Sequence, residues 1–459
     1  MADVELSRSL KSRHLTMISI GGIIGAGLFV ASSASIVAVG PAIVVSYIIT
    51  GTLILLVMRM LGEMALSLPN VRSFTEFARA GLGPGAGFVT GWLYWYFWMI
   101  VVPVEAIAGA KILEHWIPGV PQGITGLVLM AAMTIVNLMS ARSYGEFEFW
   151  FSSIKVSAII AFIAIAAAYA FGWTSPHGPT FGNLTSHGGF MPHGIAAVLA
   201  GAVTVYFYMT GAEIIAVAAA ESAEGARAVA KLTSSVIVRI LIFYIGSMFL
   251  ILCVVPWDQI KVAESPFTLA LTSMHFRWAE AAMRVIILTA VLSCLNSAFY
   301  VCSRVLFVLA EKGDAPRTLI QLNARRVPVK SVLLCAIAGV AGILAEVEAP
   351  QHVFAFLVAA GGALMVFVYM IIAVAQVRLR RKREREGAPA PALTMWLFPW
   401  LSYAAIAGMA ALLIAMAFTP SLAQDLHVSL IALVVSILAY LGLRAHRRLR
   451  HSSPASAGN

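Results

Sequence analysis

Three ionisable side chains are singled out because they lie deep inside long apolar stretches of the sequence: Glu105, Lys155 and Glu213. A charge at the centre of a membrane helix costs about 2.5–3.5 kcal/mol, so each needs a partner, a water path or a function. Burial favours the neutral form of a lysine, which makes Lys155 a candidate proton-coupling residue; the alternative is an ammonium that snorkels to the interface. Glu105 is a candidate for lining a polar pathway or for a structural hydrogen bond between helices. Glu213 is a candidate gating, structural or proton-relay residue.

Glycines cluster in the first apolar stretch, with four in the seven residues 21–27. Each destabilises a helix by about 1 kcal/mol relative to alanine, so we expect the helix to break here. Close packing against another helix is the alternative, because small residues also permit that. A break would leave the N–H groups of Gly25, Ala26 and Gly27 free to bind a carboxylate.

A second candidate break lies in the sixth apolar stretch, at Val205–Glu213. Broken helices in transporters present half-helix N-termini to anions and unwound carbonyls to cations. A zwitterion satisfies both ends, with carbonyls near Ile20, Phe207 and Thr210 receiving its ammonium. Phe207 is expected to act as a gate over the substrate. The predicted substrate-binding residues are Ile20, Ile24, Gly25, Ala26, Gly27, Phe207, Tyr208, Thr210, Gly211, Cys294 and Ala360.

The elements that position these residues are predicted to be about twelve membrane-spanning helices. Of the 459 residues, 60% are hydrophobic and only 11% are charged, against about 25% charged in soluble domains. Apolar runs of about 20 residues recur with short polar gaps. We predict an all-α polytopic membrane protein with spans near 15–38, 42–67, 86–112, 120–140, 149–173, 193–220, 233–256, 279–310, 328–348, 351–377, 396–418 and 427–444.

The net charge of +10 is distributed as a membrane topology requires. Lysine and arginine gather in alternate loops, in the run 378–385 and in the tail 444–450, which places both termini in the cytoplasm by the positive-inside rule. The charge therefore indicates contact with anionic membrane lipids and not with nucleic acid. The four cysteines lie in apolar runs, so no metal site is predicted. The oligomeric state stays open.

Several segments together carry a resemblance to a known family. They include Met58–Leu61, Gly91–Trp95, Tyr144–Trp150, Gly211–Ile214, Ala218–Ser222, Ser293–Ser297 and Met395–Leu397. The chain resembles the amino acid-polyamine-organocation superfamily, in particular the bacterial amino acid permeases, and most of all those for γ-aminobutyrate (GABA). The similarity runs from Leu10 to about Leu441.

The resemblance implies a fold and a mechanism. It implies an inverted five-plus-five repeat of the LeuT-like type, with helices 1 and 6 unwound and two further C-terminal helices. The segments would be a cytoplasmic N-terminus (1–14), two repeats (15–173 and 193–377) around a periplasmic loop (174–192), a basic cytoplasmic loop (378–395), helices 11 and 12 (396–444) and a cytoplasmic tail (445–459). It also implies proton-driven import across the bacterial inner membrane by alternating access, without a cofactor, and matches Lys155 to a proton-coupling lysine.

One departure from the family pattern keeps the substrate open. A hydroxyl side chain is expected near the substrate in the tenth span, but this chain has only valine, alanine and glycine at 358–362. Therefore β-alanine, proline or another neutral amino acid remain alternatives, as does amino acid exchange. A channel is disfavoured because no repeated filter sequence occurs. An enzyme is disfavoured because no catalytic set lies near the midplane.

Overall fold

The computed structural model describes residues 9–69, 71, 73–222, 225–262, 264–349, 353, 356–357, 361 and 363–452. Within them the chain is helical and has no strand, apart from one isolated bridge between Leu10 and Ser222. The helices are, in chain order, α1 (Ser12–Gly21), η1 (Gly27–Ala31), α2 (Ser32–Val39), α3 (Ile43–Ser67), α4 (Phe74–Leu82), α5 (Pro84–Leu113), α6 (Gln122–Met139), α7 (Ala141–Ala170), η2 (Phe181–Leu184), α8 (Gly194–Tyr208), α9 (Ile214–Ala218), η3 (Ala219–Glu221), α10 (Gly225–Val254), η4 (Trp257–Gln259), α11 (Pro266–Ser273), α12 (Ala279–Glu311), η5 (Arg317–Ile320), α13 (Val329–Glu348), α15 (Leu364–Arg385), α16 (Trp400–Phe418) and α17 (Pro420–Ser452).

The described helices are those of a multi-pass membrane protein. Eight are long and apolar enough to cross a membrane, and the shorter apolar stretches Gly27–Val39, Gly194–Tyr208 and Leu241–Val254 accompany them. Two of these short pieces are halves of the predicted first and sixth spans, which confirms that both are interrupted. The predicted all-α polytopic fold is therefore confirmed.

The first span breaks immediately after Gly21. Residues 22–25 leave the helical conformation, and the chain resumes as the π-helical η1 and then α2. A Cβ at Gly21 would lie 1.7 Å from the Ser152 hydroxyl and 2.3 Å from a Glu148 carboxylate oxygen on α7. Both interpretations of the glycine cluster thus apply, because Gly21 permits close helix packing and the glycines after it lie at the break.

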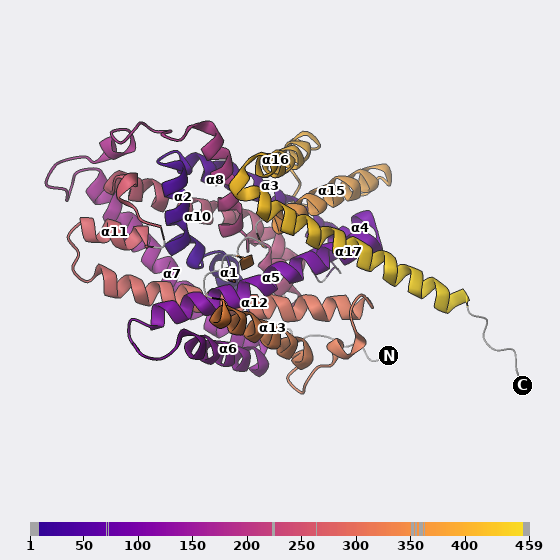
Figure 1. The fold of residues 1–459 in the computed structure, drawn as a ribbon. Coiled ribbons are helices and arrows are strands. Elements are labelled where there is room, and N and C mark those ends of the chain that lie inside the picture. Colours follow the sequence, from indigo (N-terminus) through magenta and orange to yellow (C-terminus); the bar gives the residue numbers. More distant parts are fainter. Residues whose placement is uncertain are drawn as a thin grey trace, which may run out of the picture.

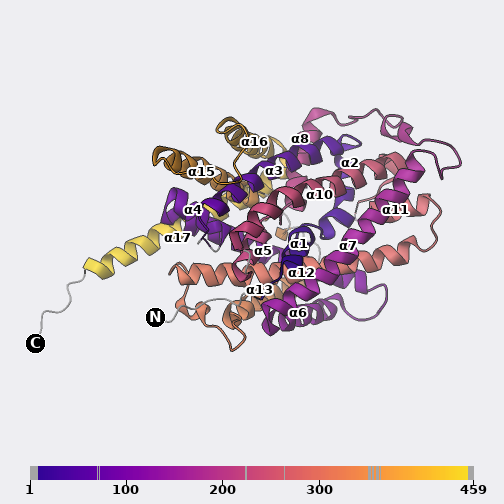
Figure 2. The same cartoon turned by 180° about the vertical axis from the view of Figure 1, so that it is seen from behind.

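The broken helices lie at the centre of the bundle. α1 packs against α7, α9, α10 and α12, while α3 lies along α10 and α5 along α12 (Figures 1 and 2). α17 crosses α5 and α16, and its C-terminal end projects away from the other helices (Figure 1). The residues nearest the breaks are therefore enclosed by other helices.

Several helices extend beyond the apolar runs that predicted them. α7 begins at Ala141, before the predicted 149, α10 begins at Gly225, before 233, and α17 covers Pro420–Ser452 instead of 427–444. α15 continues to Arg385, so the first part of the predicted basic loop 378–395 is helical. Hydropathy marks only the lipid-matched part of a helix, and polar turns at its ends escape that signal. For α7 the start is a cap, because the Ser140 hydroxyl accepts the Ser143 N–H at 3.0 Å.

Candidate functional site

Lys155 points into the first break. The side chain is fully buried on α7. Its Nζ donates to the Gly21 carbonyl at 2.6 Å, the Ile24 carbonyl at 2.8 Å and the Ser293 hydroxyl at 2.8 Å. Three acceptors match the three N–H donors of an ammonium. The side chain therefore ties α7 to the unwound backbone and to α12, and it does not snorkel to the interface.

Glu148 is the anionic partner of this site. It is fully buried, and its Oε1 accepts hydrogen bonds from the Ser152 hydroxyl at 2.8 Å and from the Ser293 hydroxyl, while Oε2 is a buried atom without a hydrogen-bond partner. Ser293 thus connects the carboxylate to the Lys155 ammonium. The sequence interpretation missed Glu148 because it placed the residue before the predicted span. The spacing of residues 148, 152 and 155 on one helix face was the available signal.

The second break lies between α8 and α9, at residues 209–213. Gly211 has a φ of 126°, a conformation that glycine adopts without steric penalty. A Cβ there would lie 2.6 Å from the Gly22 carbonyl oxygen, so the two breaks meet backbone to backbone. The Tyr244 hydroxyl lies 2.9 Å from the Ile23 carbonyl and 3.1 Å from the Tyr208 carbonyl. One hydroxyl on α10 therefore contacts both unwound segments.

Glu213 holds the second break in place. Its carboxylate accepts hydrogen bonds from the Tyr94 hydroxyl at 3.1 Å, from the Gly211 N–H at 3.0 Å and from the Tyr369 hydroxyl. The side chain is fully buried. Since Tyr94 belongs to α5 and Tyr369 to α15, one carboxylate connects the unwound backbone to two surrounding helices.

Glu105 lies at the predicted carboxylate-binding end of the first break. Its carboxylate faces the Ala26 N–H and the Cys294 thiol, and its Oε1 would be 3.1 Å from a Cβ at Gly25. The side chain is 6% exposed, and its Oε2 is a buried atom without a hydrogen-bond partner. A carboxyl group of the protein therefore already lies at the position assigned to the substrate carboxylate.

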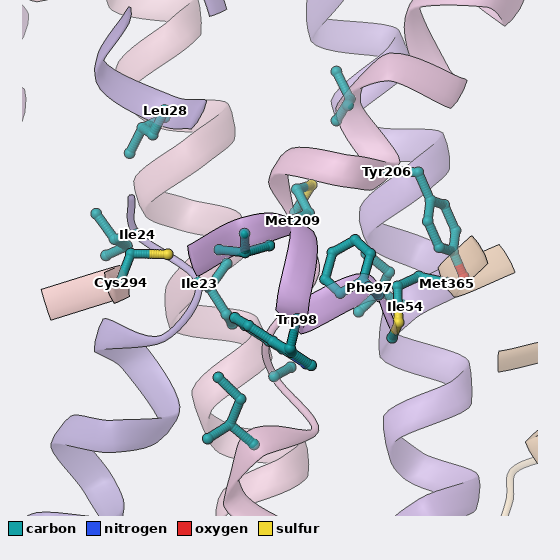
Figure 3. Packing of buried hydrophobic residues seen from close by; sticks show 14 of the residues in the cluster. Ile23, Ile24, Leu28, Ile54, Phe97, Trp98, Tyr206, Met209, Cys294 and Met365 are labelled. Atoms are coloured by element: carbon teal, nitrogen blue, oxygen red, sulfur yellow. The ribbon is translucent and has the colours of Figure 1, made fainter. Parts of the chain in front are cut away.

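Phe207 lies in an aromatic and apolar wall beside the breaks. Its ring packs edge-on against Phe97 with centroids 5.6 Å apart, and a Cβ at Gly361 would lie 2.7 Å from it. Figure 3 shows buried apolar side chains of this region, among them Phe97, Trp98 and Met209, with Cys294 beside Ile24. Phe207 and Phe97 therefore contribute to the apolar surface beside the two breaks.

The remaining predicted residues lie around the same point. Ile20 and Ile24 are buried beside the first break, and Gly27 faces the ring of Tyr208. The Thr210 hydroxyl donates to the Tyr206 carbonyl at 2.9 Å. Ala360 lies outside the described residues.

A buried ion pair joins the segment after the second break to α12. The Glu221 Oε1 accepts the Arg304 Nε–H at 2.7 Å and the Tyr300 hydroxyl at 3.0 Å. The Arg304 guanidinium lies 4.3 Å from the Tyr300 ring centroid, and that ring stacks on Tyr144 at 3.9 Å. The Leu10 N–H donates to the Glu221 carbonyl at 3.1 Å. The sequence interpretation missed Arg304, although its position within the predicted span 279–310 was a sufficient signal.

Comparison with known proteins decides the family. The family model described as amino acid permease matches residues 14–453. The γ-aminobutyric acid permease of Bacillus subtilis (strain 168) is 43% identical over 443 residues, which cover 96% of this chain and 94% of that protein. The chain belongs to the amino acid permease family. The γ-aminobutyric acid permease of Escherichia coli (strain K12) is 41% identical, over 92% of this chain and 91% of that protein.

A solved structure supports the fold of this permease. The crystal structure of the Eremococcus coleocola manganese transporter, in complex with an aromatic bis-isothiourea substituted compound, aligns with a TM-score of 0.58 at 13% identity. The alignment covers 96% of this chain and 97% of that one. At this identity the likeness concerns the fold alone, and it confirms the predicted LeuT-like class.

Proposed function

We propose that this permease imports a small zwitterionic amino acid, GABA or a close analogue, together with protons and by alternating access. The observation that carries the proposal is the contact between the two unwound segments, where Gly211 meets the Gly22 carbonyl. Unwound helix ends offer N–H groups to a carboxylate and carbonyl groups to an ammonium, which is the pair of charges that a zwitterion carries. The names of the similar permeases favour GABA among the zwitterions.

The residues at the two breaks bind the substrate, gate the site and couple it to protons. The amides of Gly25, Ala26 and Gly27 bind the substrate carboxylate, with Cys294 at the same end of the site. The break from Phe207 to Gly211 receives the ammonium, and Phe207 and Glu213 gate the site. Lys155 is the proton-coupling residue, because its ammonium holds the carbonyls on one side of the first break. Loss of its proton would weaken that hold and favour movement of α1.

Uptake into liposomes that contain the purified protein tests this function. Labelled GABA should accumulate when the outside is acidic, without sodium, and saturate with concentration. β-Alanine, proline and α-amino acids added as competitors determine the substrate range. Uptake only into vesicles preloaded with an amino acid would indicate exchange, and uptake without saturation would favour a channel.

Lys155→Ala tests the coupling role. The variant should bind labelled GABA but lose gradient-driven accumulation, because the titratable group that holds the Gly21 and Ile24 carbonyls is absent. Lys330→Ala is the matched control, since Lys330 is exposed at the start of α13. Normal concentrative uptake by Lys155→Ala would refute the coupling role.

We further propose that the protein resides in the bacterial inner membrane with both termini in the cytoplasm. The arginines near the ends of α15 and α17 support this orientation through the positive-inside rule. A fluorescent protein that folds only in the cytoplasm, fused to the C-terminus, should fluoresce. Activity of a periplasm-dependent reporter at the same position would reverse the orientation.

A further inference from the structure

The protein's own side chains satisfy both ends of the first break. The Lys155 ammonium binds the Gly21 and Ile24 carbonyls, and the Tyr244 hydroxyl contacts the Ile23 carbonyl. The Glu105 carboxylate faces the Ala26 N–H at the opposite end. The unwound backbone therefore has a carboxyl group of the protein at one end and a lysine amine at the other, the two groups that a zwitterion would present.

The Glu105 carboxyl group is held by fewer hydrogen bonds than the Lys155 side chain. The Lys155 ammonium has three acceptors, whereas Glu105 has a buried Oε2 without a hydrogen-bond partner. A buried polar atom without a partner is destabilising, and more so when it is charged. The other oxygen is 3.1 Å from the position of a Gly25 Cβ. Glu105 therefore lies at the backbone where the substrate carboxylate is proposed to bind.

We propose that Glu105 competes with the substrate carboxylate for the amides of the first break, and that it must take up a proton before substrate binds. The inference rests on the proposed function. One proton from the outside adds to the Glu105 carboxylate, which changes the charge of that side chain from −1 to 0. The neutral carboxyl group leaves the amides, and the substrate carboxylate takes its place. The net charge beside Ala26 is then unchanged, and no covalent bond of the substrate is altered.

The geometry explains why an unprotonated Glu105 opposes binding. Two carboxylates at one set of amides repel each other, and such pairs share a proton. The charged or titratable groups that face Glu105 are Lys155 on α7, Cys294 on α12 and Tyr244 on α10. All three remain in a variant that changes only Glu105, so this variant isolates the contribution of the carboxylate.

Binding of labelled GABA to the protein in nanodiscs, measured from about pH 5 to pH 8, tests the proposal. GABA keeps both charges over most of this range. For the wild type, linkage to one proton predicts that Kd rises with pH, by at most about tenfold per unit. Glu105→Gln cannot take up the proton and should bind with a Kd that is independent of pH and close to the acidic wild-type value. Glu105→Asp should keep the pH dependence.

The outcomes separate this proposal from the function on which it rests. A wild-type protein that binds no amino acid at any pH would overturn the proposed function itself. A wild type that binds GABA, with an unchanged pH dependence in Glu105→Gln, would overturn only the role of Glu105. Glu105→Ala, which also lacks the carboxylate, provides a second measurement if the glutamine variant is unstable. It should likewise lose the pH dependence.

Discussion

Replacing Arg304 by methionine should destabilise this permease strongly, because it leaves the Glu221 carboxylate buried without its cation. Both side chains are at most 2% exposed. The substitution removes a charge-assisted hydrogen bond of 2.7 Å, worth about 1.5–3 kcal/mol. It also removes the guanidinium above the Tyr300 ring, worth about 2 kcal/mol when desolvated. The sum agrees with the loss of about 3–5 kcal/mol typical of breaking a buried ion pair.

Thiol labelling during heating measures this loss. All four cysteines of the chain are buried, so a dye that fluoresces on reaction with thiols reports unfolding. The unfolding entropy per residue of soluble proteins, applied to 459 residues, predicts that Tm falls by about 1 °C for each kcal/mol lost from the free energy of unfolding. We therefore expect Tm to fall by roughly 3–5 °C. Arg284→Met is the matched control. Its ion pair with Glu280 is half-exposed, so it should cost at most about 1 kcal/mol.

The double variant Glu221→Gln with Arg304→Met tests whether the unpaired charge of Glu221 causes the lower Tm of Arg304→Met. Removing both members leaves no buried unpaired charge, so the double variant should melt closer to the wild type than Arg304→Met does. An unchanged Tm for Arg304→Met would refute the reasoning. A double variant whose fall in Tm equals or exceeds the sum of the falls for Glu221→Gln alone and Arg304→Met alone would refute it as well.

Three further outcomes are expected. Gly211→Ala should lower Tm and abolish GABA binding, because the φ of 126° disfavours alanine and the added Cβ would lie 2.6 Å from the Gly22 carbonyl oxygen. Gly246→Ala should be tolerated, because the nearest atom to a Cβ at that position is 3.8 Å away. Glu213→Gln should reduce uptake at least tenfold in a folded protein, because a lost hydrogen bond to a charged group is worth about 1.5–3 kcal/mol; uptake at the wild-type rate would contradict this. Asn137→Ala removes a buried 2.9 Å hydrogen bond to Asn296 and should cost only about 1 kcal/mol in the thiol assay.

The sequence predicted local features of this protein well. Apolar runs of about 20 residues predicted the helices, because hydropathy depends on composition alone. The glycines at 21–27 predicted the first break, since helix propensity is a property of neighbouring residues. Helix ends and the short helices α4 and α11 were not predicted, because their polar turns carry little hydropathy signal.

The tertiary structure decided which groups meet at the breaks. Lys155 and the Gly21 carbonyl are 134 residues apart in the chain, and no local pattern relates them. The same holds for Arg304 and Glu221, separated by 83 residues. The sequence by itself determined that charges lie in the membrane and that helices break. Only the packing of α5, α7 and α12 around the first break placed Glu105 near Gly25 and Lys155 at the Gly21 and Ile24 carbonyls. Such contacts depend on the relative positions of helices, which the periodicity of one sequence does not contain.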